Sequence, residues 1–243
     1  MSQIVDFTQV IRNDMNALLN VHTHRDQSRS PYAGLTSNVL PEAQRSQTGV
    51  SSEYVQKPNH EWYVLRVTYN RTEKACGIIS TSGVESYMPM HYVIKKEIGK
   101  KKRILQPLLP NLFFVYATRE DVAEIVKKKD DKKTPILKYY LDKIKPIEAN
   151  GKHPPLTIPS EAMTNFIKAT STESEHVRIV SSEQCHYKTG DIVKVIGGEF
   201  KGVTGRVARI SGQQRVVVEI SGLCLVATAY IPKGFLEKNN LNL

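Results

Sequence analysis

Short apolar runs separated by glycine-containing turns fill the last quarter of the chain, between Tyr187 and Glu237. The runs at 192–195, 203–210, 216–220 and 223–231 are rich in β-branched residues and predict four or five strands. Gly197-Gly198 and Ser211-Gly212 separate runs, and glycine adopts the positive φ of such turns at little cost. Short strands at this spacing are typical of a small closed β-barrel.

The middle of the chain alternates strand and helix patterns. Strands are predicted at residues 62–68, 84–90, 92–98, 102–108 and 112–117. Helices are predicted over 71–81, after Thr118 and after Ser160, and Asn70, Thr118 and Ser160 are expected to be their N-caps. The order β-α-β-β-β-α predicts an α+β domain in which helices cover one face of an antiparallel sheet.

The N-terminal residues carry a different pattern. Apolar positions in residues 1–21 have helical spacing, and we expect this short helix to pack on its own protein rather than on a partner. Residues 22–58 are polar and predict a flexible tail. The sequence therefore predicts four parts. They are a helix and tail at 1–58, a sheet domain at 59–169 with an insert at about 130–155, a linker at 170–183 and a barrel at 184–243.

Charge is concentrated in the middle of the chain. The net charge is +10, and residues 59–170 hold 20 basic and 12 acidic residues, whereas residues 171–243 hold 9 and 7. An anionic partner of the middle segment is therefore expected. The alternative, that these lysines only keep the surface solvated, would explain the excess of positive charge equally well. The predicted hairpin around Gly99 carries the densest cluster. Its members, expected to contact a nucleic-acid backbone without reading sequence, are Lys95, Lys96, Lys100, Lys101, Lys102 and Arg103. A solvated hairpin tip is the alternative.

The stretch GDIVKVIGGEFKGVTGRV resembles the KOW motif. Its pieces are Gly190-Asp191, Gly198-Glu199-Phe200 and Lys201-Gly202-Val203-Thr204-Gly205. The last four residues also form a GXXG, as in KH domains, but the KH loop joins two helices and this one lies between strand patterns.

The middle segment resembles the NGN domain that precedes KOW in the NusG family. The matching stretches are Trp62-Tyr63-Val64-Leu65, Glu85-Ser86-Tyr87-Met88-Pro89 and residues 107–115. The resemblance implies an NGN-like sheet with helices on one face, a flexible linker and a small C-terminal KOW β-barrel. Strongly β-prone Val216, Val217 and Val218 further predict that this barrel does not refold into helices.

The resemblance also implies a transcription elongation or antitermination factor that binds RNA polymerase. The positions matching the polymerase-binding pocket are Trp62, Tyr63, Pro110, Leu112 and Phe114. Alternate residues of a strand face the helices, so Phe113 and Val115 are expected in the core, and Leu112 and Phe114 are the better contact candidates.

The KOW domain of the family recruits a second partner, Rho or a small-subunit ribosomal protein. Ile196, Phe200 and Lys201 match that surface, with barrel core as the slightly favoured alternative for Ile196. The N-terminal tail and altered insert suggest a specialised paralogue of the RfaH or UpxY type that acts at particular operons. A housekeeping NusG factor and a ribosomal RNA-binding protein remain alternatives.

Motifs of catalysis are missing from the sequence: it has no P-loop and no G-x-S-x-G, and its histidines are scattered. We therefore expect a binding protein without cofactor or metal rather than an enzyme. An enzyme acting on nucleic acid through the 130–155 insert is the rival, disfavoured by the lack of clustered acids. Cys76, Cys185 and Cys224 are expected to be reduced thiols. Without signal peptide or membrane span, a cytoplasmic monomer is expected.

Overall fold

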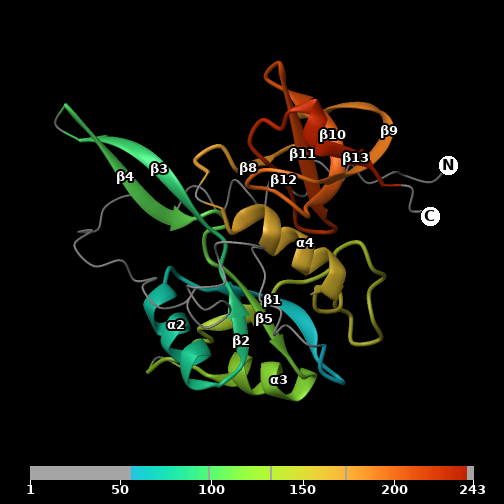
Figure 1. Ribbon diagram of the computed structural model, residues 1–243. Helices are drawn as coiled ribbons and strands as arrows, with labels where there is room; N and C mark the ends of the chain where they lie inside the picture. The colour runs from blue at the N-terminus through green and yellow to red at the C-terminus, as the bar shows by residue number, and fades with distance from the viewer. Residues whose placement is uncertain (1–55, 98, 132, 173, 240–243) are drawn as a thin grey trace. The chain divides into compact units, whose positions relative to one another are not determined.

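The computed structural model describes residues 56–97, 99–131, 133–172 and 174–239, and it is an α+β structure (Figure 1). Its described part contains three α-helices and antiparallel sheets, which confirms the predicted fold class. The described residues begin at Gln56. The helix predicted over residues 1–21 therefore lies outside them, and so does the predicted tail as far as Val55.

An antiparallel sheet lies in unit 2 of the chain's two compact units, and this unit comprises the described residues up to Met88 together with 109–163. Its strand order is β2-β5-β1-β6, and β7 also pairs with β1. The strands are β1 (Glu61–Val67), β2 (Glu85–Tyr87), β5 (Leu112–Ala117), β6 (Leu137–Tyr139) and β7 (Thr157–Ile158). Helices α2 (Thr72–Thr81) and α3 (Arg119–Lys127) lie on the same side of this sheet (Figure 1).

Apolar sequence explains why β1 and β5 are central. Every residue of β5 is buried, as expected for a strand covered on both faces. Helix α3 begins where predicted, because the Thr118 hydroxyl accepts a hydrogen bond from the Asp121 N–H at 3.2 Å. Val122 and Ile125 are its buried residues. Strand β6, inside the predicted insert, pairs with β1, so part of that insert extends the sheet.

The start of α2 differs from the prediction. Asn70 has φ +56° and lies one residue too early, and the N-cap is Arg71, which makes no side-chain capping bond. The Arg71 guanidinium instead donates to the Thr68 carbonyl oxygen at 3.0 Å and forms an ion pair with Asp130. The residue before α2 is thus used to hold the loop that leads into β6.

The predicted strand at 84–90 is two strands. β2 ends at Tyr87 and pairs with β5, whereas β3 (Met90–Glu97) pairs with β4 (Lys100–Pro107) in a separate two-stranded sheet. Pro89 lies between them and has no N–H for a ladder hydrogen bond, which explains the break. The β3–β4 hairpin confirms the predicted pair of strands around Gly99.

The C-terminal strands form a six-stranded antiparallel sheet in the order β13-β9-β10-β11-β12-β8. Their bounds are β8 (Arg178–Val180), β9 (His186–Val195), β10 (Thr204–Ile210), β11 (Gln213–Ile220), β12 (Cys224–Ala227) and β13 (Leu236–Lys238). A register shift between Arg206 and Ala208 marks a bulge in β10. The edge strands β8 and β13 have three residues each, and among the described residues no ladder joins them. The expectation of a closed barrel is therefore corrected to an open six-stranded sheet.

Strand β8 belongs to a segment that the sequence predicts as a linker. It lies inside residues 170–183 and pairs with β12 from Arg178 to Val180, so the end of that segment belongs to the C-terminal sheet. Short 3₁₀-helices follow at η2 (Ser182–Gln184) and η3 (Lys233–Phe235). Cys185 and Ala208 lie with Ile210 and Val217 in the buried cluster on one face of this sheet.

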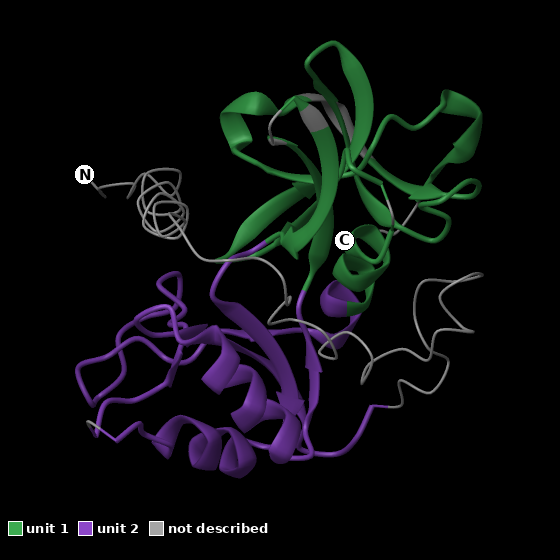
Figure 2. Cartoon of the chain, turned by 90° about the vertical axis from the view of Figure 1, so that its left-hand side faces the viewer, with its two compact units in different colours: residues 1–17, 89–108, 164–243 green, residues 18–88, 109–163 purple. Residues whose placement is uncertain are grey.

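Unit 1, which holds this C-terminal sheet, contains more than the sheet. It groups residues 89–108 and the chain from Thr164 onward, so it includes the β3–β4 hairpin and most of α4 (Ser160–Thr170) (Figure 2). The Asn165 side-chain amide explains part of this grouping: it accepts from the Thr204 N–H at 2.7 Å and donates to the Thr204 carbonyl oxygen. The domain bounds expected from the sequence remain a prediction.

Candidate functional site

The β3–β4 hairpin brings four lysines into two facing pairs. The register sets Lys95 opposite Lys102 and Lys96 opposite Lys101. Like charges directly across an antiparallel ladder repel each other. Lys96, Lys101 and Lys102 are exposed and Lys95 is half-buried, so water screens this repulsion in the free protein. A bound polyanion would remove the repulsion and replace the counterions.

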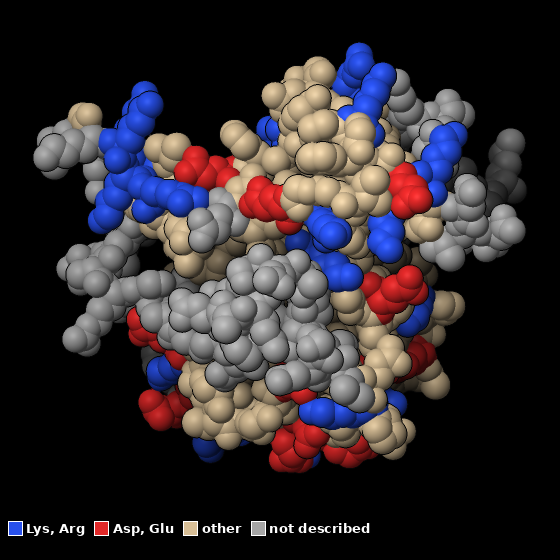
Figure 3. Space-filling view, in the orientation of Figure 1, with Lys and Arg blue, Asp and Glu red and all other residues tan. Residues whose placement is uncertain are grey.

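Figure 3 shows lysine and arginine side chains concentrated along this hairpin. The structure therefore brings together the lysines predicted as one nucleic-acid contact. Lys100 is placed by its backbone alone, opposite Glu97 in the register next to the turn.

Arg103 differs from the hairpin lysines, with which it was grouped in the sequence. Its guanidinium carbon lies 3.7 Å from the centre of the Tyr92 ring, and its Nε is 3.0 Å from a carboxylate oxygen of Glu175. Both interactions hold the side chain within its own unit. Arg103 is thus engaged midway along the hairpin, and contact with a phosphate would compete with Glu175.

The predicted polymerase contacts lie together on β1 and β5, but they are largely buried. Trp62, Leu112 and Phe114 are each 0% exposed and share one face of the sheet, since Arg66 is opposite Leu112 and Trp62 opposite Tyr116. Pro110 is half-buried.

Tyr63 is on the other face of β1, opposite Val115. Its hydroxyl donates to Glu61 at 3.0 Å, and burial first, then this hydrogen bond, raises the pKa of Tyr63 to about 12. Phe113 and Val115 are 0% exposed, as expected for core residues, and Leu112 and Phe114 on the opposite face are 0% exposed as well. A partner reaches the Trp62–Phe114 face only if that face becomes uncovered.

The corner between β9 and β10 separates the three residues expected to bind a second partner. Ile196 is 45% exposed, Phe200 is 5% exposed and Lys201 is exposed. The slightly favoured core position of Ile196 is therefore wrong, and Phe200 takes that role instead. The corner is closed by the Gly202 N–H, which donates to the Val195 carbonyl oxygen at 2.7 Å.

Phe235 joins this corner and was missed from the sequence. It is 41% exposed, and its ring lies so close to Gly197 that a Cβ there would come within 3.0 Å of it. Its carbonyl oxygen accepts a hydrogen bond from the Ile196 N–H at 2.9 Å. Ile196 and Phe235 together form an exposed apolar pair, which we call the corner patch. The Gly197-Gly198 pair was the only local signal for it, because two glycines leave room for a ring.

Other site types find no support in the described residues. No group of three or more potential metal ligands occurs in the part of the chain described here. Within those same ranges no helix is long and apolar enough to cross a membrane. Burial of Cys76 and Cys224 raises the pKa of each thiol to about 12, which makes both poor nucleophiles.

Comparison with known families agrees with this arrangement. The family model described as transcription termination factor nusG matches residues 60–167, and the KOW motif model matches residues 189–219. No curated protein sequence matches the chain. These two domains are those of non-enzymatic transcription factors, and proteins with them bind RNA polymerase and nucleic acid. With an NGN-type match followed by a KOW match along one chain, the protein belongs to the NusG family of transcription elongation and antitermination factors.

Proposed function

We propose that this protein binds elongating RNA polymerase through its NGN-type domain and suppresses pausing or termination, with the KOW sheet recruiting a second partner. The observation that carries the proposal is the order of the two matched domains, residues 60–167 followed by 189–219, in one chain. The facing lysines of the β3–β4 hairpin support it, since they suit the backbone of nucleic acid beside an elongation complex.

Action at particular operons is the second part of the proposal. Residues between 130 and 155 depart from the tight turn of the family, and they carry exposed apolar side chains at Leu141, Ile144 and Ile147. Such side chains on a charged loop are available to a further protein or to polymerase itself.

The corner patch is the proposed contact for the second partner, Rho or a small-subunit ribosomal protein. Ile196 and Phe235 are exposed, apolar and held by a rigid glycine-rich corner, which are properties of binding anchors. Lys201 lies beside them in the corner and is exposed to an acidic partner. We place the protein in the cytoplasm as a monomer, where RNA polymerase and ribosomes are both accessible.

In vitro transcription with purified RNA polymerase tests the proposal. Templates would carry a pause site or a terminator, each with and without candidate leader sequences. Suppression of pausing on every template means a housekeeping factor, and suppression that depends on one leader means a specialised one. Absence of any effect and of polymerase binding would overturn the proposal, and co-sedimentation with ribosomes would then favour a ribosomal protein.

The predicted polymerase contact has to be tested without truncating its buried residues. Replacing Leu112 or Phe114, both 0% exposed, by alanine would cost about 2–5 kcal/mol of stability and confuse folding with binding. Trp62 is the only tryptophan of the chain. Labelled as 5-fluorotryptophan, it should change its ¹⁹F resonance on polymerase binding if the Trp62–Phe114 face becomes uncovered. An unchanged resonance in a saturated complex would move the contact elsewhere.

A further inference from the structure

A groove opens at the end of the C-terminal sheet opposite the corner patch. Its volume is about 540 Å³, and its lining residues are Arg209, Gly212, Gln213, Gln214, Tyr230 and Lys233. The corner patch follows β9, whereas this groove surrounds the next turn, between β10 and β11. Successive turns of an antiparallel sheet lie at opposite ends, so the two surfaces are separate. Neither the hairpin lysines nor the corner patch contributes to it.

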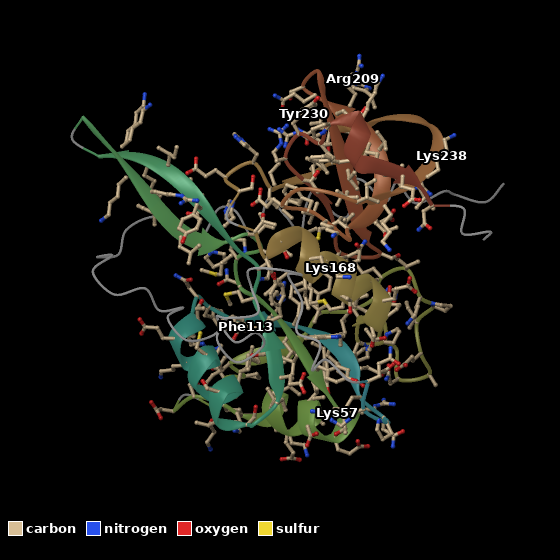
Figure 4. The ribbon with its side chains drawn as sticks, in the orientation of Figure 1. Lys57, Phe113, Lys168, Arg209, Tyr230 and Lys238 are labelled. Atoms are coloured by element: carbon tan, nitrogen blue, oxygen red, sulfur yellow. The ribbon has the colours of Figure 1, made fainter. Side chains whose placement is uncertain are left out.

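The lining combines cations, an aromatic ring and two amides, without an acidic residue among its members. Tyr230 is 56% exposed, unusual for a large ring at the edge of a sheet. Arg209 is exposed and directly opposite Gln214 in the ladder, so both side chains leave the same face. Figure 4 shows Arg209 and Tyr230 at this end of the sheet.

The two glutamines are oriented by different partners. Arg215 donates to the Gln213 side-chain oxygen at 2.9 Å, which leaves the Gln213 Nε2 as a donor for a ligand. The Gln214 Nε2 donates to the Ile231 carbonyl oxygen at 3.1 Å, which leaves the Gln214 Oε1 as an acceptor. The lining therefore offers one amide donor and one amide acceptor to a ligand with polar edges, such as a nucleobase.

Other basic residues lie near the groove. His186 on β9 is opposite Arg209, and Arg178 donates to the Ser211 hydroxyl at 3.4 Å next to Gly212. Burial and then the positive charge of Arg178 lower the pKa of Arg215. The net charge of the C-terminal segment is small, so this concentration of cations is local.

We infer that this groove binds one or two nucleotides of a single-stranded nucleic acid, with a base stacked on Tyr230 and phosphates held by Arg209 and Lys233. An aromatic platform beside cations is the common arrangement for single strands, and it does not accept a stacked duplex. A volume of about 540 Å³ lies within the range of small-ligand sites. The protein then holds a transcript or an unpaired DNA strand at the KOW sheet, independently of the hairpin.

Fluorescence anisotropy on the full chain tests this inference. The probes are a labelled 12-mer of uridine, the same length of thymidine, a 12-base-pair duplex and a polyglutamate peptide. The background protein carries Lys95→Gln, Lys96→Gln, Lys101→Gln and Lys102→Gln, which removes the hairpin contribution. The inference rests on single-strand binding that survives in this background, and tighter binding of uridine than of thymidine identifies RNA as the occupant.

Substitutions in the groove then have distinct signatures. Tyr230→Ala should weaken single-strand binding about 5- to 150-fold, whereas Tyr230→Phe keeps the stacking face and should bind like the background protein. Arg209→Gln with Lys233→Gln should lower the slope of log K against log salt by about 1.4, the value for two phosphates of a single strand. Tyr69→Ala is the control, since Tyr69 is a 79% exposed ring outside the groove.

Several results would overturn the inference. Binding abolished by the four hairpin substitutions alone assigns all nucleic acid to the hairpin. Equal loss in Tyr69→Ala and Tyr230→Ala removes the role of the groove, and preference for polyglutamate makes it a peptide site. A negative result for the groove would not affect the proposed function, because the transcription assay measures pausing and termination by RNA polymerase and does not measure binding at this groove.

Discussion

Gly205 and Gly77 cannot be told apart by residue type, but they differ in the space around the Cα atom. A Cβ added at Gly205 in β10 would clash with the Val217 carbonyl oxygen of the neighbouring strand. A Cβ at Gly77 in α2 would meet nothing within 4 Å. Only the first glycine is therefore required by close backbone approach, and the second costs helix stability.

We expect Gly205→Ala to destabilise the fold by about 1–3 kcal/mol through overpacking and Gly77→Ala to stabilise it by about 0.5–1 kcal/mol. Urea unfolding followed by circular dichroism measures both. The two variants are controls for each other, because each adds one methyl group. A Gly205→Ala protein as stable as wild type would contradict the close contact with Val217.

Ile196 and Phe200 invite a second comparison at the residue scale. Phe200 is 5% exposed, so Phe200→Ala should cost about 3–5 kcal/mol. Ile196 is 45% exposed, so Ile196→Ala should change stability by less than about 0.5 kcal/mol and reduce binding of the KOW partner. Thermal unfolding measures the loss of stability, and a pull-down with purified Rho or ribosomal protein measures the loss of partner binding. Partner binding unaffected by both Ile196→Ala and Phe235→Ala would exclude the corner patch.

At the scale of elements, the β3–β4 hairpin sets its lysines opposite one another. The sequence shows how many lysines the hairpin has, but not how they are paired across the two strands. Its register produces facing lysine pairs, and Glu175 and Tyr92 hold Arg103 midway along the hairpin. The element therefore combines an anchored arginine with a charged outer part. This arrangement favours contact along a phosphate backbone rather than reading of bases.

Changing the four paired lysines, 95, 96, 101 and 102, to glutamine should weaken binding to an elongation complex and lower its salt dependence. Four lost phosphate contacts on duplex DNA lower the slope of log K against log salt by about 3.6. The matched control changes four exposed lysines outside the hairpin, Lys128, Lys129, Lys138 and Lys152. An equal effect of both sets would mean that net charge alone matters, and no effect at low salt would exclude the hairpin.

At the scale of the whole molecule, three buried acids resist losing a proton. Burial is the largest cause that raises the pKa of Tyr63, Cys76 and Cys224, each to about 12. In the unfolded chain the thiols ionise near pH 9 and the phenol near pH 10. Between those values and pH 12 the unfolded state binds fewer protons than the folded state, so stability falls as pH rises.

We therefore expect the urea midpoint to be constant from pH 7 to about pH 8 and to decrease steadily above pH 9. Lysines titrate in the same range, so the informative comparison is with Cys224→Ala. Cys224 is 2% exposed, and its removal should make the decrease shallower. Parallel curves for the two proteins would show that this thiol ionises equally in both states.

The sequence by itself determined the central strands, the helices and their order, because periodicity, capping residues and turn glycines are local. Strand β5 at residues 112–117 and the Thr118 cap were predicted with their observed bounds. The ordered motifs likewise identified the NusG family, since each depends on residues close together in the chain. The hairpin lysines were found for the same reason.

Tertiary structure alone decided which of those residues are accessible. Burial depends on neighbours distant in sequence, so alternation predicted different environments for Phe113 and Phe114, although β5 is covered on both faces. Phe235 reaches the corner patch from more than thirty residues away, and β8 enters the sheet from a segment with the composition of a linker. The groove at Tyr230 has the same origin, because register across β10 and β11 and one returning segment bring its residues together.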